Sequence, residues 1–114
     1  ETHKKWFNRI LNDDTTGFMV LEYGQDIIGQ LRFDFDEKYP VISISLNKKY
    51  RGLGLSKYLL NNGINYIKEN YNQNTLIADI KKSNARSISF FEAMGFKKEY
   101  EIRNGSALRF IYRG

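Results

Sequence analysis

"SLNKKYRGLGLSKYLL" at residues 45–60 joins a strand pattern to a helical pattern through a basic turn that contains two glycines. Gly52 and Gly54 in the turn let the backbone approach a bulky group without a Cβ in the way. A turn that opens a helix after a strand directs several free N–H groups to one point, where the helix dipole adds positive charge. Four basic residues surround it: Lys48, Lys49, Arg51 and Lys57. The stretch therefore predicts an anion-binding site.

Two common phosphate-binding motifs do not fit this turn. A Walker A loop requires G-x-x-x-x-G-K-[ST], and the turn lacks that spacing. A dinucleotide-binding fingerprint requires a third glycine where Lys57 stands, and it begins a parallel βαβ unit. The segments before the turn are instead typical of an antiparallel meander, so both nucleotide motifs are excluded on spacing.

Upstream of the turn, the pattern predicts three consecutive antiparallel strands. They are expected at 18–23, 27–35 and 41–46, with turns at 24–26 and 36–40. The strand at 41–46 alternates strictly between apolar and polar residues. Before them, the apolar residues of 3–12 recur at helical spacing, and the sequence predicts a helix there.

Downstream, the sequence predicts a helix at 54–70, a buried strand at 75–80 and a second helix. Ser83 or Asn84 caps the second helix and Gly95 ends it. Asn104-Gly105 predicts a hairpin between the last two strands. Because a helix connects them, the strand at 75–80 is expected to run parallel to the strand at 41–46 if the two are neighbours. The fold class is therefore α/β, a mixed sheet with helices on its faces.

Composition limits the chain to one domain, residues 1–114, of a globular kind. Apolar residues make up 41% and aromatic residues 15% of its 114 residues, and no apolar run is long enough to span a membrane. Cysteine is absent, which excludes disulfides, thiolate metal sites and a cysteine nucleophile and fits a cytoplasmic location. The net charge of +5 favours anionic partners. Its basic residues gather at a glycine turn instead of alternating with aromatics, so nucleic acid is not the expected partner.

"RGLGLS" at 51–56 resembles the Q/R-x-x-G-x-G/A signature of the GNAT superfamily of acetyl-CoA-dependent N-acetyltransferases. "SNARSISFFEAMGF" at 83–96 is similar to the second motif of that family, and the helix and strand between the two motifs match as well. The resemblance covers roughly residues 3–112. It implies a GNAT-like fold that lacks the first strand–helix unit of the family. The chain is accordingly expected to be a fragment or the C-terminal part of a longer protein.

The resemblance also implies roles for individual residues. The pyrophosphate of acetyl-CoA is expected at Arg51, Gly52, Leu53, Gly54, Leu55 and Ser56. The pantetheine arm is expected to pair as a pseudo-strand with Leu46, Asn47 and Lys48, which belong to the end of the preceding strand. Asn84 is expected to contact the cofactor, and Phe91 to lie beside the thioester. No metal is implied.

Two of these positions depart from the family pattern. Ser56 replaces the usual small Gly or Ala, and its hydroxyl can still donate to a phosphate. Phe91 stands where many members have the tyrosine that is proposed to protonate the leaving thiolate. Water, Tyr100 or Tyr112 would have to serve instead, or no acid is needed, because a thiol with a pKa of about 8.5 leaves readily as its thiolate.

Acetyl transfer to an amine requires a neutral nitrogen, and a carboxylate can remove the proton of the ammonium. Asp79, five residues before Asn84, resembles the strand acid of ribosomal-protein N-terminal acetyltransferases and is the predicted catalytic base. The alternative is an acid paired with a neighbouring Lys or Arg. The developing oxyanion needs a hydrogen-bond donor, and the resemblance implies a backbone N–H near Leu46. His3 and Trp6 contact the acceptor, or else His3 lies on the surface and Trp6 in the core.

Function is predicted from this resemblance as transfer of an acetyl group to a primary amine by direct attack in a ternary complex. The motifs look most like acetyltransferases of amino-sugar and nucleotide-sugar biosynthesis. A protein N-terminal acetyltransferase is the alternative within the class. A non-catalytic acyl-CoA-binding regulatory module is the alternative of another class. The implied partners are a small-molecule amine and either a second copy of the chain or a fused upstream domain.

Overall fold

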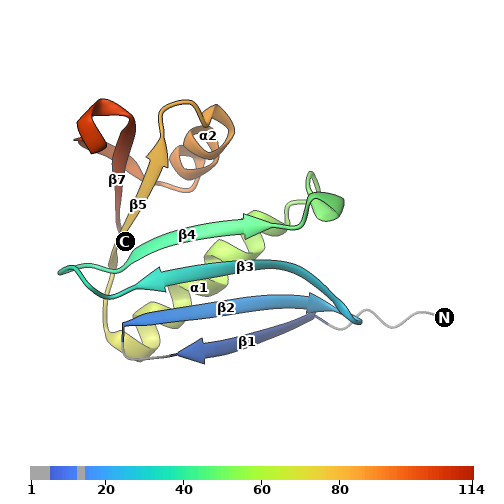
Figure 1. Ribbon diagram of the computed structural model, residues 1–114. Coiled ribbons are helices and arrows are strands. Elements are labelled where there is room, and N and C mark those ends of the chain that lie inside the picture. Colours follow the sequence, from blue (N-terminus) through green and yellow to red (C-terminus); the bar gives the residue numbers. More distant parts are fainter. Residues whose placement is uncertain (1–5, 13–14) are drawn as a thin grey trace.

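The described residues, 6–12 and 15–114 with side chains from residue 15 onward, form one mixed sheet and two α-helices in this computed structural model. The sheet has seven strands in the order β1-β2-β3-β4-β5-β7-β6 (Figure 1). Only β4 and β5 run parallel, and all other neighbours are antiparallel. The predicted mixed α/β architecture is confirmed, including the parallel pairing that follows the helical connection.

The strands before the first helix are β1 (Trp6–Asn12), β2 (Thr16–Tyr23), β3 (Asp26–Asp34) and β4 (Val41–Leu46). After a 3-10 turn at Lys48–Tyr50 come α1 (Leu55–Tyr71), β5 (Thr75–Lys81), α2 (Ala85–Ala93), β6 (Lys97–Ile102) and β7 (Ala107–Arg113), with a second 3-10 turn at Arg103–Gly105. Every element predicted from residue 18 onward is present, with ends that differ by a few residues.

The prediction of a helix at 3–12 was wrong for the residues that the structure describes. Residues 6–12 form β1, which pairs with β2 along its whole length, from Trp6↔Tyr23 to Asn12↔Gly17. The apolar pairs that indicated a helix are four residues apart. A spacing of four puts two side chains on one face of a helix and also on one face of a strand, so it does not distinguish them. His3 and the side chain of Trp6 lie outside the described part.

The hydrophobic core lies between the sheet and both helices. Leu59, Leu60 and Ile67 of α1 and Phe91 of α2 belong to one buried cluster with residues from the strands. The strand residues of this cluster are Met19, Leu21, Ile28, Leu31, Phe33, Ile42, Leu76, Ala78, Ile80, Leu108 and Phe110. Because side chains alternate along a strand, Ser43, Asp79 and Arg109 lie on the other face of the sheet.

The ends of α2 and the last hairpin follow the predicted chemistry. The side chain of Asn84 accepts a hydrogen bond from the Ser87 N–H at 3.2 Å and caps the helix. Gly95, with φ of 96°, lets the chain leave the helix in a left-handed conformation. Asn104 and Gly105 take positive φ between β6 and β7, as this dipeptide does in tight hairpins.

Within the described residues, neither helix has the length and apolar character needed to cross a bilayer.

Candidate functional site

The parallel strands β4 and β5 separate after only two residue pairs, Val41↔Ile77 and Ile42↔Ala78. Figure 1 shows β5 and β7 angled away from the four N-terminal strands. The carbonyl of Pro40 accepts a hydrogen bond from the Ile77 N–H, so alternate residues after it direct their backbone groups to the β5 side. Ile44 and Leu46 thus point backbone N–H and C=O groups into the fork between β4 and β5, where neither has a β5 partner.

The glycine turn lies at the open end of this fork. Gly52 and Gly54 have φ of 82° and 75°, and a Cβ added to either would meet no atom within 4 Å. Gly54 is the N-cap of α1 and has no side-chain cap, so no capping side chain occupies the first amides of the helix. The turn is therefore an open surface of backbone donors.

A cavity of about 890 Å³ joins the fork, the turn and the start of α2. It is lined by Ile44, Ser45, Leu46, Arg51, Gly52, Gly54, Leu55, Ser56, Lys57, Asn84, Arg86, Ser87 and Phe90. Segments from three separate parts of the sequence thus meet at one place, and seven of the predicted cofactor residues are among them: Leu46, Arg51, Gly52, Gly54, Leu55, Ser56 and Asn84.

Four predicted cofactor residues do not line the cavity. Asn47 donates its side-chain amide to the Ile27 carbonyl at 3.2 Å and accepts from the Lys49 N–H at 3.1 Å, so it caps the 3-10 turn. Lys48 and Leu53 are exposed outside the cavity. Phe91 is only 3% exposed and packs against Phe96 in the core.

Phe90, Arg86 and Ser87 line the cavity in positions that the motif did not indicate. One residue along a helix turns the side chain by about 100°, which places Phe90 in the wall and Phe91 in the core. The predicted cap at Asn84 could have indicated Arg86 and Ser87. The first turn of a helix places the two or three residues after the cap near the same opening as the cap.

Positive charge in the cavity has no counter-charge among the described side chains. Arg51, Lys57 and Arg86 all line it. Within the part of the chain that the structure describes, their side chains make no ion pair or hydrogen bond. Unpaired cations beside an open turn of backbone donors are suited to a ligand that carries several negative charges.

The start of β3 holds the segment that precedes the glycine turn. Tyr50 donates its hydroxyl to Asp26 at 2.6 Å, and the Lys49 ammonium lies 3.5 Å from the same carboxylate. The hydrogen bond from Tyr50, followed by the charge of Lys49, lowers the pKa of Asp26, and the same bond raises the pKa of Tyr50. The Asn47 N–H also bonds to the Ile28 carbonyl at 2.7 Å. These contacts fix where the glycine turn begins.

A model of the acetyltransferase (GNAT) family matches residues 1–96. The chain belongs to the GNAT family. It is 26% identical over 106 residues to an N-alpha-acetyltransferase of Sulfurisphaera tokodaii, which covers 91% of this chain and 63% of the relative. It is 28% identical over 95 residues to an N-alpha-acetyltransferase of Saccharolobus solfataricus, covering 82% and 56%. This GNAT chain thus spans less than two thirds of the length of these curated relatives.

Solved structures share the fold of this GNAT chain. The spermidine N-acetyltransferase of Vibrio cholerae in complex with CoA and spermine has a TM-score of 0.77 at 17% identity, over 88% of this chain and 66% of that one. The N-acetyltransferase PseH of Campylobacter jejuni has a TM-score of 0.75 at 22% identity, over 89% and 70%. At these identities the likeness concerns the fold alone.

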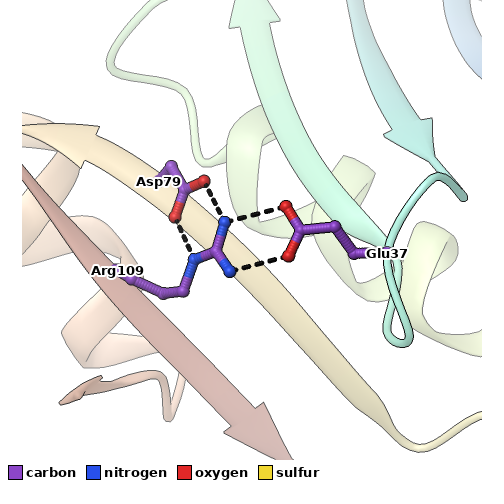
Figure 2. Close-up of polar contacts among 3 residues, drawn as sticks. All are labelled: Glu37, Asp79 and Arg109. Carbon is purple, nitrogen blue, oxygen red and sulfur yellow. Dashed lines mark hydrogen bonds and ion pairs between the residues drawn. The ribbon is translucent and has the colours of Figure 1, made fainter. Parts of the chain in front are cut away.

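Asp79 lies outside the cavity wall of this GNAT chain, in a cluster with Arg109 and Glu37 (Figure 2). Arg109 donates to both oxygens of Asp79 at 2.9 Å and to both oxygens of Glu37 at 2.8 and 3.0 Å. The Asp79 and Arg109 side chains are 10% and 14% exposed, and Glu37 is 47% exposed. The hydrogen bonds that Arg109 donates to Asp79 and then to Glu37 raise the pKa of Arg109 above its ordinary value, and the bond from Arg109 lowers the pKa of Glu37.

The alternative that Asp79 pairs with a neighbouring basic residue is therefore confirmed, with Arg109 as the partner. Its role as a catalytic base stays a prediction. A carboxylate has about four lone-pair positions, and the two bonds from Arg109 occupy one on each oxygen. Asp79 thus retains acceptor capacity beside its ion pair with Arg109.

Proposed function

We propose that this chain binds acetyl-CoA in the cavity and is the part of an N-acetyltransferase that delivers the acetyl group to a primary amine. The observation that carries the proposal is the fork after Ile42, which opens into the same cavity as the glycine turn. A family member that uses acetyl-CoA requires both an unpaired strand edge and a phosphate-binding turn. In this chain, β4 after Ile42 has no β5 partner, and the glycine turn leaves its backbone donors open.

The residues fit acetyl-CoA by their chemistry. The first amides of α1 and the open backbone at Gly52 and Gly54 suit a pyrophosphate, with Arg51 and Lys57 as counter-charges. The backbone groups of Ile44 and Leu46 suit the amides of a pantetheine arm. When bound, acetyl-CoA supplies the acetyl thioester that the amine attacks.

The Leu46 N–H is the proposed donor to the oxygen of the thioester. It points into the fork from a strand that β3 holds along its other edge, from Gly29↔Leu46 to Asp34↔Val41. A donor fixed in this way needs no reorganisation as negative charge develops on the oxygen. Asp79 remains the proposed base for the ammonium of the acceptor.

No protein acid is needed for the leaving thiolate in this proposal. Neither Phe90, in the cavity wall, nor Phe91, in the core, carries a proton to give. Tyr100 and Tyr112 do not line the cavity, and Tyr112 packs on Phe96 with ring centroids 5.2 Å apart. A thiolate whose conjugate acid has a pKa of about 8.5 can leave directly and take its proton from water.

The acceptor that the relatives favour is the α-amino group of a protein or peptide, because both curated relatives are named N-alpha-acetyltransferase. The amino sugar of a nucleotide sugar rests on the sequence resemblance alone and stays a prediction. Both acceptors, with a polyamine, therefore belong in one panel for the assay.

The test measures binding and thiol release with the same preparation. Acetyl-CoA at 100 times its dissociation constant should stabilise the fold by about 2.7 kcal/mol, visible as a higher melting temperature. Gly54→Val should abolish this shift, because its side chain occupies the open side of the turn. Gly24→Val is the matched control, since Gly24 also has positive φ (62°) and open space around it but lies in the β2–β3 turn.

Release of CoA thiol with one amine of the panel identifies the acceptor. Binding of acetyl-CoA without thiol release from any amine would favour the non-catalytic module. Absence of any melting shift with acetyl-CoA would refute the proposal itself.

A further inference from the structure

Arg86 differs in origin from the other cations of the cavity. Arg51 and Lys57 flank the glycine turn, whereas Arg86 belongs to the first turn of α2, on a different wall. The neighbouring basic residue Lys82 is paired with Glu101 at 2.6 Å. Arg86 has no such partner among the described residues and lines the cavity instead. A second wall of the cavity thus presents a guanidinium that no described side chain pairs with.

The charges of the cavity can be matched to those of the proposed ligand. A pyrophosphate diester carries two negative charges, and Arg51, Lys57 and the amides of the glycine turn are sufficient to match them. CoA carries a further phosphate, a monoester on the ribose. A phosphate monoester bears roughly 1.5 to 2 negative charges at neutral pH. Lys48 and Lys49 also flank the turn but do not line the cavity, so Arg86 is the remaining basic residue among those that line it.

We propose that Arg86 binds the 3′-phosphate of the ribose and so makes this site select CoA over 3′-dephospho-CoA. The inference rests on the proposed function, because it assigns a second phosphate subsite in the same cavity. A guanidinium presents a planar fork of donors that matches two phosphate oxygens, and no carboxylate of residues 15–114 pairs with it. Arg86 is thereby a residue of ligand specificity, separate from the donors that bind the pyrophosphate.

The experiment combines a change in the protein, Arg86→Gln, with a change in the ligand, the loss of the 3′-phosphate, as in a double-mutant cycle. Dissociation constants for CoA and 3′-dephospho-CoA are measured by calorimetry with the unchanged chain, Arg86→Gln and Lys57→Gln. The unchanged chain should bind CoA roughly tenfold more tightly than 3′-dephospho-CoA, as expected for a charged hydrogen bond at an exposed site. Arg86→Gln should remove this preference while changing the affinity for 3′-dephospho-CoA less than about twofold.

Lys57→Gln is the control, because this cation stands at the glycine turn and should weaken both ligands by the same factor. Arg86→Lys tests the fork geometry and should keep only part of the preference for CoA. Equal weakening of both ligands by Arg86→Gln would assign Arg86 to the pyrophosphate and overturn the inference. So would unchanged affinity for both ligands. If the unchanged chain bound neither ligand, the proposed function would fail as well.

Discussion

The two faces of the β4–β5 junction hold arginine in opposite settings. On one, Arg86 lines the cavity and has no carboxylate partner among the described residues. On the other, Arg109 lies between Asp79 and Glu37 and makes four hydrogen bonds to their oxygens (Figure 2). One guanidinium between two carboxylates leaves the second cluster with a net negative charge. The comparison indicates that the first arginine is available to an anionic ligand and the second is occupied by the protein.

The Arg109 cluster, which consists of Glu37, Asp79 and Arg109, joins three separate elements of the fold. Glu37 belongs to the β3–β4 turn, Asp79 to β5 and Arg109 to β7. Only two residue pairs join β4 to β5, so the cluster adds a side-chain link between the two halves of the sheet. It lies at the closed end of the fork, opposite the end that opens into the cavity. Arg109 therefore links the two halves of the sheet, whereas Arg86 is placed to contact a ligand in the cavity.

Arg109→Met should have the largest effect, a decrease in the free energy of unfolding. It leaves the Asp79 carboxylate, 10% exposed, without its charge partner, which should cost about 2 to 3 kcal/mol of unfolding free energy. Urea denaturation should show a lower midpoint with an unchanged slope. Arg113→Met is the control on the same strand and face, because its partner Glu99 is 3.3 Å away and Arg113 is 61% exposed. Its cost should stay below about 0.5 kcal/mol, and equal costs for the two variants would contradict the assignment.

Local chemistry explains why most of this fold could be predicted from the sequence. The helix after the glycine turn, the cap at Asn84, the stop at Gly95 and the hairpin at Asn104-Gly105 each depend on residues that lie within a few positions of one another. The parallel pairing of β4 and β5 followed from the helical connection between them. The segment at 6–12 could not be assigned in this way, because its pairing with β2 decides its structure and its own spacing does not.

The site was predictable where a backbone motif defines it and not where a side-chain direction does. Gly52, Gly54 and Leu46, which are predicted to bind the cofactor, line the cavity, whereas Phe90 lines it in place of Phe91, one residue away along α2. Arg109 and Glu37 are 72 positions apart and carry no local signal of their contact. Only the sheet order, with β7 beside β5, brings them together with Asp79.

Asp79→Asn tests whether the paired carboxylate also works as the base. If it does, turnover at neutral pH should fall at least about tenfold while the KM for acetyl-CoA stays unchanged. The amide cannot accept a proton from the ammonium, yet it keeps the volume of the side chain. Glu37→Gln is the matched control, because it weakens the same cluster through Arg109 and leaves Asp79 in place. A similar turnover for Asp79→Asn and the unchanged chain would restrict Asp79 to the ion pair.

Glu37→Gln should have the smallest effect on the free energy of unfolding, and this effect should depend on pH. The hydrogen bond from Arg109 is the main cause that lowers the pKa of Glu37 below its ordinary value of 4.5. A carboxyl group with a lowered pKa stabilises the fold fully above the unfolded pKa, and this contribution is lost as the pH falls through the folded pKa. Because Glu37 is 47% exposed, solvent screening should keep the difference from Glu37→Gln below about 1 kcal/mol at pH 6. The difference should shrink as the pH falls below 4.5 and through the lowered pKa of Glu37, and it should also decrease in about 1 M salt. A gap that is independent of pH would show that Glu37 stabilises the β3–β4 turn by its packing and not by its charge.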